Sequence, residues 1–256
     1  MRVKQIVTLV GFAALYLSSA PAIPTDAWKD KDPQAWDQKD VQKILNDSPW
    51  AKQLQFGIAP NGSLSPNLAS IGSSGVSETS GSASGGSRGV LNGGGPSTSP
   101  PIPIGSNNGP VAKLTVCWRS SVTVRQALVR EKELSHSLPD EARKNLAANY
   151  DSYQVAVSGG DLRAFSKEGV EALKARSYLM TKTTKQIIPP SNVVIQKRQD
   201  GSAVAVIFEF PKQTATGEST IAPNEKSVEF GAKVSGLPIK ATFEISKMFI
   251  NGAPDL

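Results

Sequence analysis

The stretch VVIQKRQDGSAVAVIFEF, residues 193–210, decides the fold of this chain. Two runs rich in β-branched and aromatic residues, 193–198 and 203–210, flank the sequence Gln-Asp-Gly-Ser at 199–202. Asp-Gly between two such runs is typical of a tight β-hairpin turn. The second run places apolar side chains at every second position, which predicts one buried face. The residues of that face are Val204, Val206, Phe208 and Phe210.

A second hairpin is predicted near the C-terminus, where residues 227–234 pair with 239–245 and the inward side chains are Ile239, Ala241, Phe243 and Ile245. Two further strands are predicted upstream, at 111–119 and 153–157. The first of these alternates between two faces. Its apolar face holds Leu114, Val116 and Trp118, and its other face holds Lys113, Thr115, Cys117 and Arg119.

Helices are predicted before the hairpins. Residues 122–135 form the first, and Ser137, Pro139 and Asp140 begin the second. Their inner faces consist of Val124, Ala127, Leu128 and Leu134 in the first, and Ala142, Leu146 and Tyr150 in the second. Ser166 is expected to cap a third helix reaching about residue 176, with Phe165 and Val170 at the hydrophobic-staple positions. Helices followed by hairpins predict an α+β domain over residues 111–256 with a small, mainly antiparallel sheet.

Residues 23–56 form a short tryptophan-rich helical segment. Asp37 is expected to cap its helix by accepting a hydrogen bond from the Asp40 backbone N–H. The segment holds Trp28, Trp36 and Trp50, and it is too short to bury them alone. Because large aromatic side chains need a partner surface, we expect them to dock on the domain 111–256. A ligand that covers the tryptophans is the alternative.

Residues 57–110 are rich in Gly, Ser, Pro and Asn and show no hydrophobic periodicity. Thirteen of the 22 glycines lie in this stretch, which excludes a packed core for it. The composition predicts a disordered, flexible linker.

The first 22 residues, MRVKQIVTLVGFAALYLSSAPA, have the organisation of a signal peptide. Arg2 and Lys4 precede a mostly apolar run at 6–20, and Ala20-Pro21-Ala22 is a small-x-small cleavage site. The run is shorter than the roughly 20 residues that span a bilayer, so cleavage is expected rather than anchoring. The sequence therefore predicts a secreted or periplasmic protein with no membrane span after signal removal.

The formal net charge of +6 falls by two when Arg2 and Lys4 are removed. Charges of both signs alternate along residues 111–256, which is typical of a solvated surface. Attraction to an anionic polymer of the cell envelope is one possible consequence of the excess. No basic stripe with interleaved aromatic residues is present in the sequence, so we expect no nucleic-acid partner.

The residues that carry chemistry are few. A chain with one histidine, His136, and one cysteine, Cys117, cannot form paired-histidine or clustered-thiolate zinc sites or an intramolecular disulfide. His136 lies between two predicted helices beside Ser135 and Ser137, where a solvent-facing loop position is expected. Cys117 is expected to be a buried strand residue, with an intermolecular bridge as the alternative. We assign no catalytic, metal-ligating or cofactor-binding residue and no cofactor.

Two short motifs match known sites only in part. The sequence GGSRG at 85–89 fits the hydrolase pattern G-x-S-x-G, but it lies in the predicted linker rather than at a strand-to-helix turn. The sequence SGGD at 158–161 follows a predicted strand, where backbone N–H groups could hold an anion. It lacks the dinucleotide and P-loop spacings, which favours a simple turn.

The chain resembles an uncharacterised family of exported proteins common in Acidobacteria. The resemblance is carried by the segment 36–51 with its closing SPWA, by VCWRSS at 116–121 and VRQAL at 124–128, and by residues 153–159 and 243–248. The resemblance covers most of the chain outside 57–110. It implies export, and it carries over no catalytic residue. We expect a non-enzymatic binding or interaction module in the cell envelope, whose partner is a protein or an anionic polymer. The alternative is a hydrolase that uses two carboxylates on cell-wall or extracellular polysaccharide.

Overall fold

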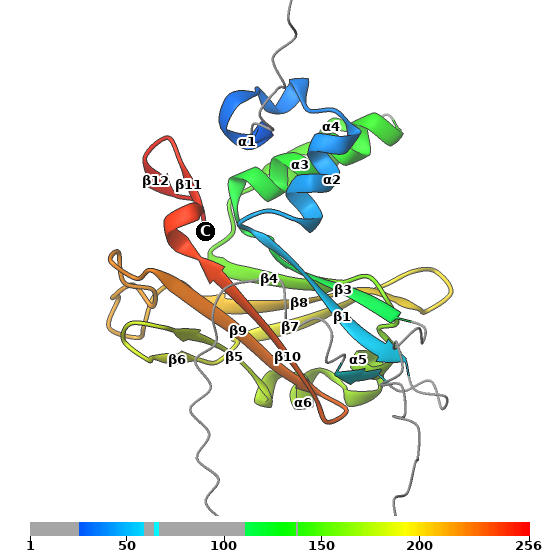
Figure 1. Ribbon diagram of the computed structural model, residues 1–256, viewed down its shortest axis with the longest axis vertical. Coiled ribbons are helices and arrows are strands. Elements are labelled where there is room, and N and C mark those ends of the chain that lie inside the picture. Colours follow the sequence, from blue (N-terminus) through cyan, green and yellow to red (C-terminus); the bar gives the residue numbers. More distant parts are fainter. Residues whose placement is uncertain (1–25, 59–63, 67–110, 137) are drawn as a thin grey trace, which may run out of the picture.

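The computed structural model describes residues 26–58, 64–66, 111–136 and 138–256, which form helices and antiparallel sheets (Figure 1). The α+β prediction is confirmed for this part of the chain. The predicted signal peptide, 1–22, lies outside the described residues, and so does the predicted linker apart from 57–58 and 64–66.

Six strands of the described chain form the larger sheet, in which all neighbours are antiparallel. In spatial order they are β2 (Leu64–Pro66), β1 (Ala51–Ile58), β3 (Val111–Trp118), β4 (Ser152–Ser158), β8 (Ala203–Pro211) and β7 (Asn192–Lys197). The hairpin predicted at 193–210 is the β7–β8 pair at one edge. The strands predicted at 111–119 and 153–157 are β3 and β4, at the centre.

The second sheet has the spatial order β10 (Leu237–Glu244), β9 (Ser227–Val234), β5 (Ser177–Thr181) and β6 (Ile187–Ile188). The β9–β10 pair is the second predicted hairpin. Its turn residues, Ser235 and Gly236, have φ angles of 48° and 82°, and such positive angles match the twist of a two-residue hairpin. A short hairpin of β11 (Phe249–Ile250) and β12 (Ala253–Pro254) follows.

The apolar faces of the two sheets pack against each other and form the core. The rings of Trp118 on β3 and Phe243 on β10 have centroids 5.3 Å apart, and those of Phe208 on β8 and Phe230 on β9 are 5.1 Å apart. Aromatic pairs at this distance add to the stability gained from burial alone. The predicted alternation of β3, β8 and β10 is confirmed, since the side chains expected to face inward from β3 and β10 are buried, as are Val206, Phe208 and Phe210 of β8.

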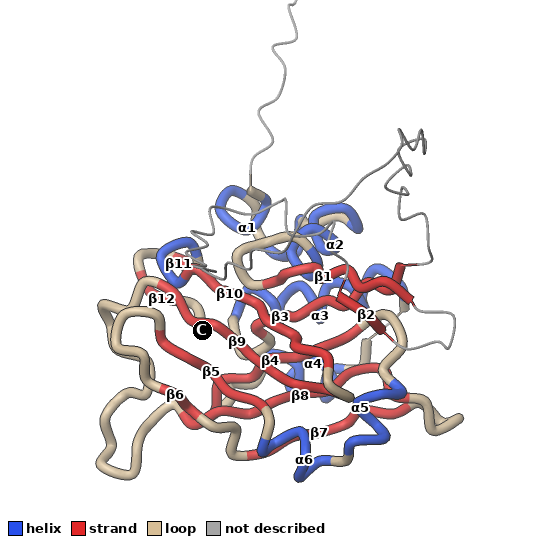
Figure 2. The backbone as a smooth tube through the Cα atoms, turned by 60° about the horizontal axis from the view of Figure 1, so that its bottom comes forward, coloured by secondary structure: helices blue, strands red, loops and turns tan. Residues whose placement is uncertain are grey.

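The helices lie outside the two sheets. They are α1 (Ala27–Asp30), α2 (Gln38–Asn46), α3 (Val122–Ser135), α4 (Asp140–Ala147), α5 (Arg163–Glu168) and α6 (Val170–Ala175), with 3-10 turns η1 (Pro33–Ala35) and η3 (Ile245–Lys247). Figure 1 shows α1–α4 gathered on one side of the sheets and α5 and α6 on the opposite side. In Figure 2, α6 lies beside β7, which it contacts. None of the helices in the described ranges has the length and apolar character needed to cross a bilayer.

The tryptophan-rich segment is part of this fold. Trp28, Trp36 and Trp50 are buried in the same core as the two sheets, which confirms the predicted docking. The segment was expected to form one helix, but it also contributes α1, η1 and the strand β1. β1 pairs with β3 from Ala51 opposite Cys117 to Gly57 opposite Val111. The segment is therefore a component of the larger sheet and not a separate body on a tether.

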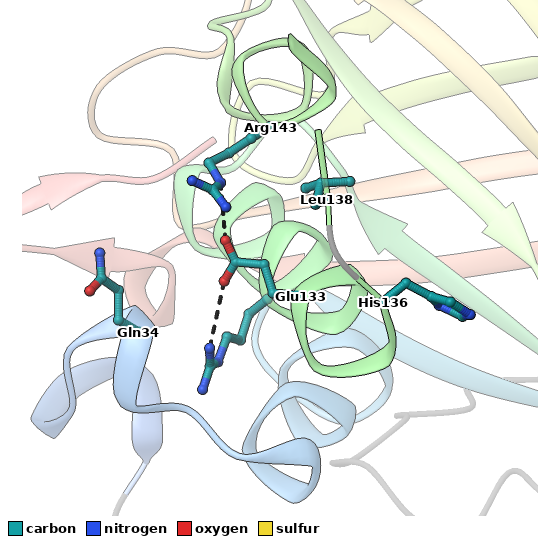
Figure 3. Close-up of a pocket in the computed structure, with 6 residues that line it drawn as sticks. Gln34, Glu133, His136, Leu138 and Arg143 are labelled. Atoms are coloured by element: carbon teal, nitrogen blue, oxygen red, sulfur yellow. Dashed lines mark ion pairs between the residues drawn. The ribbon is translucent and has the colours of Figure 1, made fainter. Parts of the chain in front are cut away.

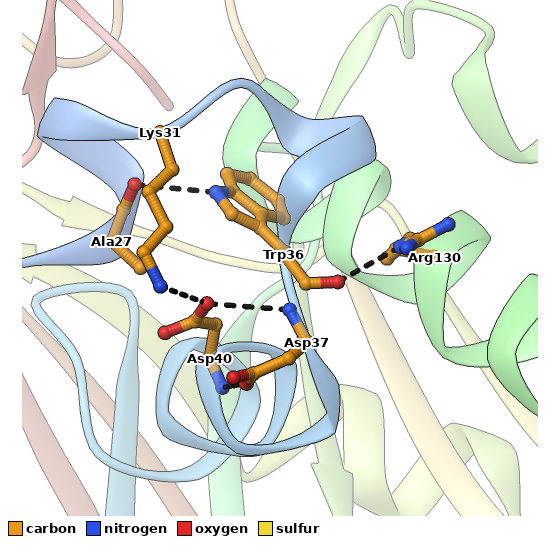
Figure 4. A network of polar contacts seen from close by, with 6 residues as sticks. All are labelled: Ala27, Lys31, Trp36, Asp37, Asp40 and Arg130. Carbon is orange, nitrogen blue, oxygen red and sulfur yellow. Dashed lines mark hydrogen bonds and ion pairs between the residues drawn. The ribbon is translucent and has the colours of Figure 1, made fainter.

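Polar contacts fix the turn that leads into α2 (Figure 4). The Asp40 N–H donates to Asp37 Oδ1 over 2.8 Å and the Asp37 N–H donates back to Asp40 Oδ2 over 3.2 Å, so the predicted cap is a full capping box. The Trp36 indole N–H donates to the Ala27 carbonyl at 3.2 Å, and Arg130 Nε on α3 donates to the Trp36 carbonyl at 2.9 Å. These contacts hold α1, α2 and α3 together.

The C-terminal tail connects the segment to α3. The Asp255 carboxylate accepts from the backbone N–H groups of Val122 at 2.5 Å and Thr123 at 3.0 Å, at the start of α3. The Asp255 carbonyl accepts from the Trp50 indole N–H at 2.8 Å. Ser121 Oγ accepts from the Val124 N–H at 3.0 Å, so three N–H groups of the first turn are satisfied.

Four details of the helix predictions are wrong. Tyr150, expected on the inner face of the second helix, lies beyond the end of α4. Ser166 lies inside α5 and not at a helix start, because Gly169, with φ of 77°, separates α5 from α6. Val170, expected at a staple position, is exposed. Leu134, expected on the buried stripe of α3, is 40% exposed, since the last turn of α3 lies largely in solvent.

Glu225 ties the loop after β5 to the beginning of β9. Its Oε1 accepts from the Lys182 N–H at 3.1 Å, and from the N–H and the hydroxyl of Thr183 at 3.0 Å and 2.9 Å. Burial favours the neutral acid, but the hydrogen bonds to Thr183 and Ser227 outweigh it. The pKa of Glu225 therefore lies below its ordinary value of 4.5.

We expect Glu225→Gln to lower the melting temperature at neutral pH and to have a smaller effect in acid. A carboxylate with a lowered pKa stabilises the fold fully above its unfolded-state pKa, and this contribution is lost as the pH falls through the lower folded-state value. Thermal melts of both proteins from neutral pH to about pH 3 test this. The exposed Glu218→Gln is the control. A difference in melting temperature that stays constant over the whole range would contradict the expectation.

Candidate functional site

A hollow of about 470 Å³ lies between the outer face of the larger sheet and helices α2 and α3. We call it the sheet hollow. Its floor consists of small side chains from three central strands, Cys117, Ala156, Ser158 and Ala205. Leu45 of α2 and Val124 and Leu128 of α3 add apolar surface, and the polar lining residues are Gln42, Asn46, Arg119, Glu131, Lys132 and Gln196. The hollow thus combines an apolar floor with a polar rim, as small-molecule sites commonly do.

A series of side-chain hydrogen bonds forms one wall of the sheet hollow. Gln42 Nε2 donates to Glu131 Oε1 at 3.1 Å, which joins α2 to α3. Asn46 Nδ2 donates to Gln42 Oε1 at 2.9 Å, and Asn46 Oδ1 accepts from the Thr115 hydroxyl at 3.3 Å. This wall extends from α3 through α2 to β3. The N-terminal segment is therefore required to build it.

Arg119 is the unusual residue of the sheet hollow. Its backbone N–H donates to the Gln154 carbonyl at 2.7 Å, which fixes the residue where β3 ends. Its side-chain Nε is buried and has no acceptor among the described residues. A buried N–H without an acceptor costs about 1–3 kcal/mol. Among the arginines of the described ranges that are at least partly buried, Arg125 and Arg130 both have acceptors, so Arg119 stands apart.

Cys117 lies on the floor of the same hollow and is 8% exposed, which confirms its prediction as a buried strand residue. Burial raises the pKa of the Cys117 thiol to about 12, and the nearby charge of Arg119 opposes this only in part. The thiolate is the reactive form of cysteine, so the native thiol is expected to be inert.

We expect a bulky thiol reagent such as Ellman's reagent to label Cys117 only after denaturation. The measurement is thiol release at mildly alkaline pH in buffer and in concentrated guanidinium chloride. One equivalent should react in denaturant and very little without it. Fast labelling of the native chain would contradict the burial of this thiol.

A second hollow of about 500 Å³ lies on the other side of α3, between η1 and α4, and we call it the helix hollow (Figure 3). Glu133 stands between two arginines there. Its Oε1 lies 3.1 Å from Arg143 Nε and its Oε2 lies 3.6 Å from Arg130 Nη1. These ion pairs join α3 to α4. A smaller hollow of about 330 Å³ adjoins it and shares both arginines and Glu133.

His136 lies at the edge of the helix hollow and is exposed, as predicted. Its ring points away from the Glu133 ion pairs in Figure 3. The hydroxyl of the neighbouring Ser135 donates to the Glu131 carbonyl at 2.9 Å, so this serine is engaged by the helix backbone. Among the described residues, which do not include Ser137, His136 therefore has no nucleophile–base contact of the kind a catalytic triad needs.

The sequence SGGD at 158–161 forms a close turn against β3. The φ angles of Gly159 and Gly160 are 79° and 53°, and an added Cβ at either position would lie about 3 Å from the Lys113 carbonyl oxygen. Asp161 pairs with Arg163. The turn is explained by this close approach of two backbones, and the GGSRG motif at 85–89 lies outside the described residues.

The carboxylate-hydrolase alternative needs two carboxyl groups across a cleft. Glu131 is the one carboxylate among the described residues lining the sheet hollow, and it accepts from Gln42. The smaller hollow holds Asp32 and Glu133, but Asp32 caps η1 and Glu133 is paired with two arginines. Within the described ranges, no group of three or more His, Cys, Asp or Glu side chains could hold a metal ion.

No family model, no curated protein and no solved structure matches this chain. The resemblance to exported acidobacterial proteins therefore stays a prediction. Sequence reasoning placed Cys117 and Arg119 on one face of a strand, and the structure adds α2 and α3 above that face. Sequence reasoning assigned no role to Arg119, and only its position beside Cys117 in the alternating pattern could have pointed to it.

Proposed function

We propose that this chain is an exported, non-enzymatic binding or interaction module of the cell envelope, secreted or periplasmic after removal of residues 1–22. The observation that carries the proposal is the sheet hollow, whose lining combines a floor of small side chains with Arg119, a residue whose buried Nε has no acceptor among the described residues. An uncompensated buried donor is costly for stability, and a ligand that accepts from it removes that cost. Such a site suits binding better than chemistry.

The Gly/Ser/Pro-rich composition of residues 57–110 supports a disordered stretch, and this belongs to the same proposal. Strands on both sides of residues 67–110, β2 and β3, belong to one sheet. The stretch then works as a long loop of one domain and not as a spacer between two bodies.

The export part of the proposal is tested by expressing residues 1–256 in a Gram-negative host. We expect the mature protein in the periplasm or the medium, with a mass that corresponds to cleavage after Ala22. A cytoplasmic protein that keeps its first 22 residues would contradict export.

The binding part is tested by sedimenting the mature protein with purified cell-wall polymer and by assaying the same mixture for new reducing ends. Co-sedimentation without reducing ends supports a binding module. Release of reducing ends would support the hydrolase alternative instead. A salt series separates two modes of binding, because attachment through exposed charge weakens as salt is added.

A further inference from the structure

The sheet hollow has the features of a site for an organic anion. Arg119 is the first of them. An arginine side chain stays protonated at all physiological pH values, and its planar group of donors matches a carboxylate. In the described part of the chain, no carboxylate pairs with Arg119. In the helix hollow, by contrast, Arg130 and Arg143 share Glu133. The acceptor for Arg119 is therefore expected to come from a ligand.

The remaining charges of the hollow favour the same sign of ligand. Lys132 forms no ion pair with any described residue, and it adds a second positive charge to the lining. Glu131 contributes the one negative charge of the described lining, and its Oε1 is occupied by Gln42. The net charge of the lining side chains is positive.

The floor of the hollow indicates what the rest of the ligand looks like. Cys117, Ala156 and Ala205 present small, apolar groups, and the amide side chains of Gln42, Asn46 and Gln196 lie around them. A sugar ring fits this pattern, because its C–H face packs on apolar surface while its hydroxyl groups bond to amides at the rim. The volume of about 470 Å³ is within the usual range of small-ligand sites.

We propose that the sheet hollow binds a hexuronate, an acidic sugar whose carboxylate is held by Arg119 and whose ring lies on the Cys117–Ala156–Ala205 floor. This inference rests on the proposed function and names its ligand class. The uronate is either a free monosaccharide or one residue of an acidic polysaccharide. Both sources present the same carboxylate to Arg119.

The test is isothermal titration of the mature protein with sodium glucuronate, with glucose and inorganic phosphate as comparisons. We expect glucuronate to bind to the parent protein. Glucose should bind to the parent roughly 10- to 100-fold more weakly than glucuronate does, because a hydrogen bond to a charged group is lost. Arg119→Gln should bind glucuronate more weakly than the parent by the same factor, for the same reason. Arg143→Gln in the helix hollow is the matched control and should bind as the parent does. Displacement of glucuronate by an oligomer of the same sugar, an oligoglucuronate, identifies the polymer as the source. If the oligoglucuronate does not displace glucuronate, the source is the free acid.

The variants also have a readout that does not depend on the ligand. Because Arg119 Nε makes no bond to a described residue, Arg119→Gln should melt no lower than the parent without ligand. Arg119→Lys, which keeps the charge, should retain part of the affinity. The proposal is overturned if glucuronate does not bind, if phosphate binds equally well, or if Arg143→Gln rather than Arg119→Gln abolishes binding. Retention on cell-wall polymer together with no glucuronate binding would overturn this inference and leave the proposed function standing.

Discussion

Replacing Trp50 with alanine is expected to lower the free energy of unfolding by about 3–5 kcal/mol, the usual cost of truncating a fully buried large aromatic side chain. Trp50 has no exposed surface, its ring packs edge-on against Trp28 at 5.8 Å, and its indole N–H donates to the Asp255 carbonyl. The change removes all three contributions at once. Denaturation by urea, followed by circular dichroism, measures the loss.

Phe249→Ala is the control for this variant, because Phe249 is also aromatic but 40% exposed. Its effect should stay within roughly 0.5 kcal/mol, as for most surface substitutions. If Trp50→Ala were no more destabilising than Phe249→Ala, the tryptophan-rich segment would not be docked in solution. An unchanged melting temperature after deletion of residues 23–56 would lead to the same conclusion.

Removal of the last two residues, 255–256, is expected to cost about 2–4 kcal/mol, although it shortens the chain very little. The truncation leaves the buried Trp50 indole N–H without its acceptor and removes the carboxylate that bonds to Val122 and Thr123. Both losses act on groups that folding has already removed from water. Equilibrium unfolding of the full and shortened chains gives the difference.

Asp255→Ala separates the two parts of that effect. This variant keeps the carbonyl that accepts from Trp50 and loses only the carboxylate at the start of α3, so it should cost less, about 1–2 kcal/mol. A truncation no more harmful than Asp255→Ala would show that the bond to Trp50 contributes nothing. If neither change alters stability, the C-terminal tail is not docked on α3.

Strong hydrophobic alternation allowed much of the fold to be predicted. The β7–β8 and β9–β10 hairpins, β3, β4 and α3 all have apolar side chains at regular spacing, and these side chains form the core between the sheets. Six described strands were not predicted: β1, β2, β5, β6, β11 and β12, of which β2 lies inside the stretch expected to be a linker. For β5 and β1 the reason is physical. The inward side chains of β5 are Ser177, Leu179 and Thr181, so two of three are polar. β1 contains lysine and glutamines, and its place is set by pairing with β3 rather than by its own pattern.

The candidate site was predictable only in part. Cys117 and Arg119 were placed on the polar face of β3, which is correct. What covers that face could not be predicted, because α2 is placed there by the pairing of β1 with β3, across the intervening residues 59–110, and by its packing on α3. The missing acceptor of Arg119 Nε is a property of the packed structure. No pattern in a single sequence encodes it.

Hexuronate binding in the sheet hollow is tested most directly by the amide chemical shifts of the ¹⁵N-labelled mature protein during titration with sodium glucuronate. We expect saturable shifts confined to the residues around the sheet hollow, at 42–46 of α2, at 117–119 where β3 ends and at 128–132 of α3. Arg119→Gln should remove these shifts, and Arg143→Gln should leave them unchanged. Shifts centred on Arg130 and Arg143, or no saturable shifts at all, would contradict hexuronate binding in the sheet hollow.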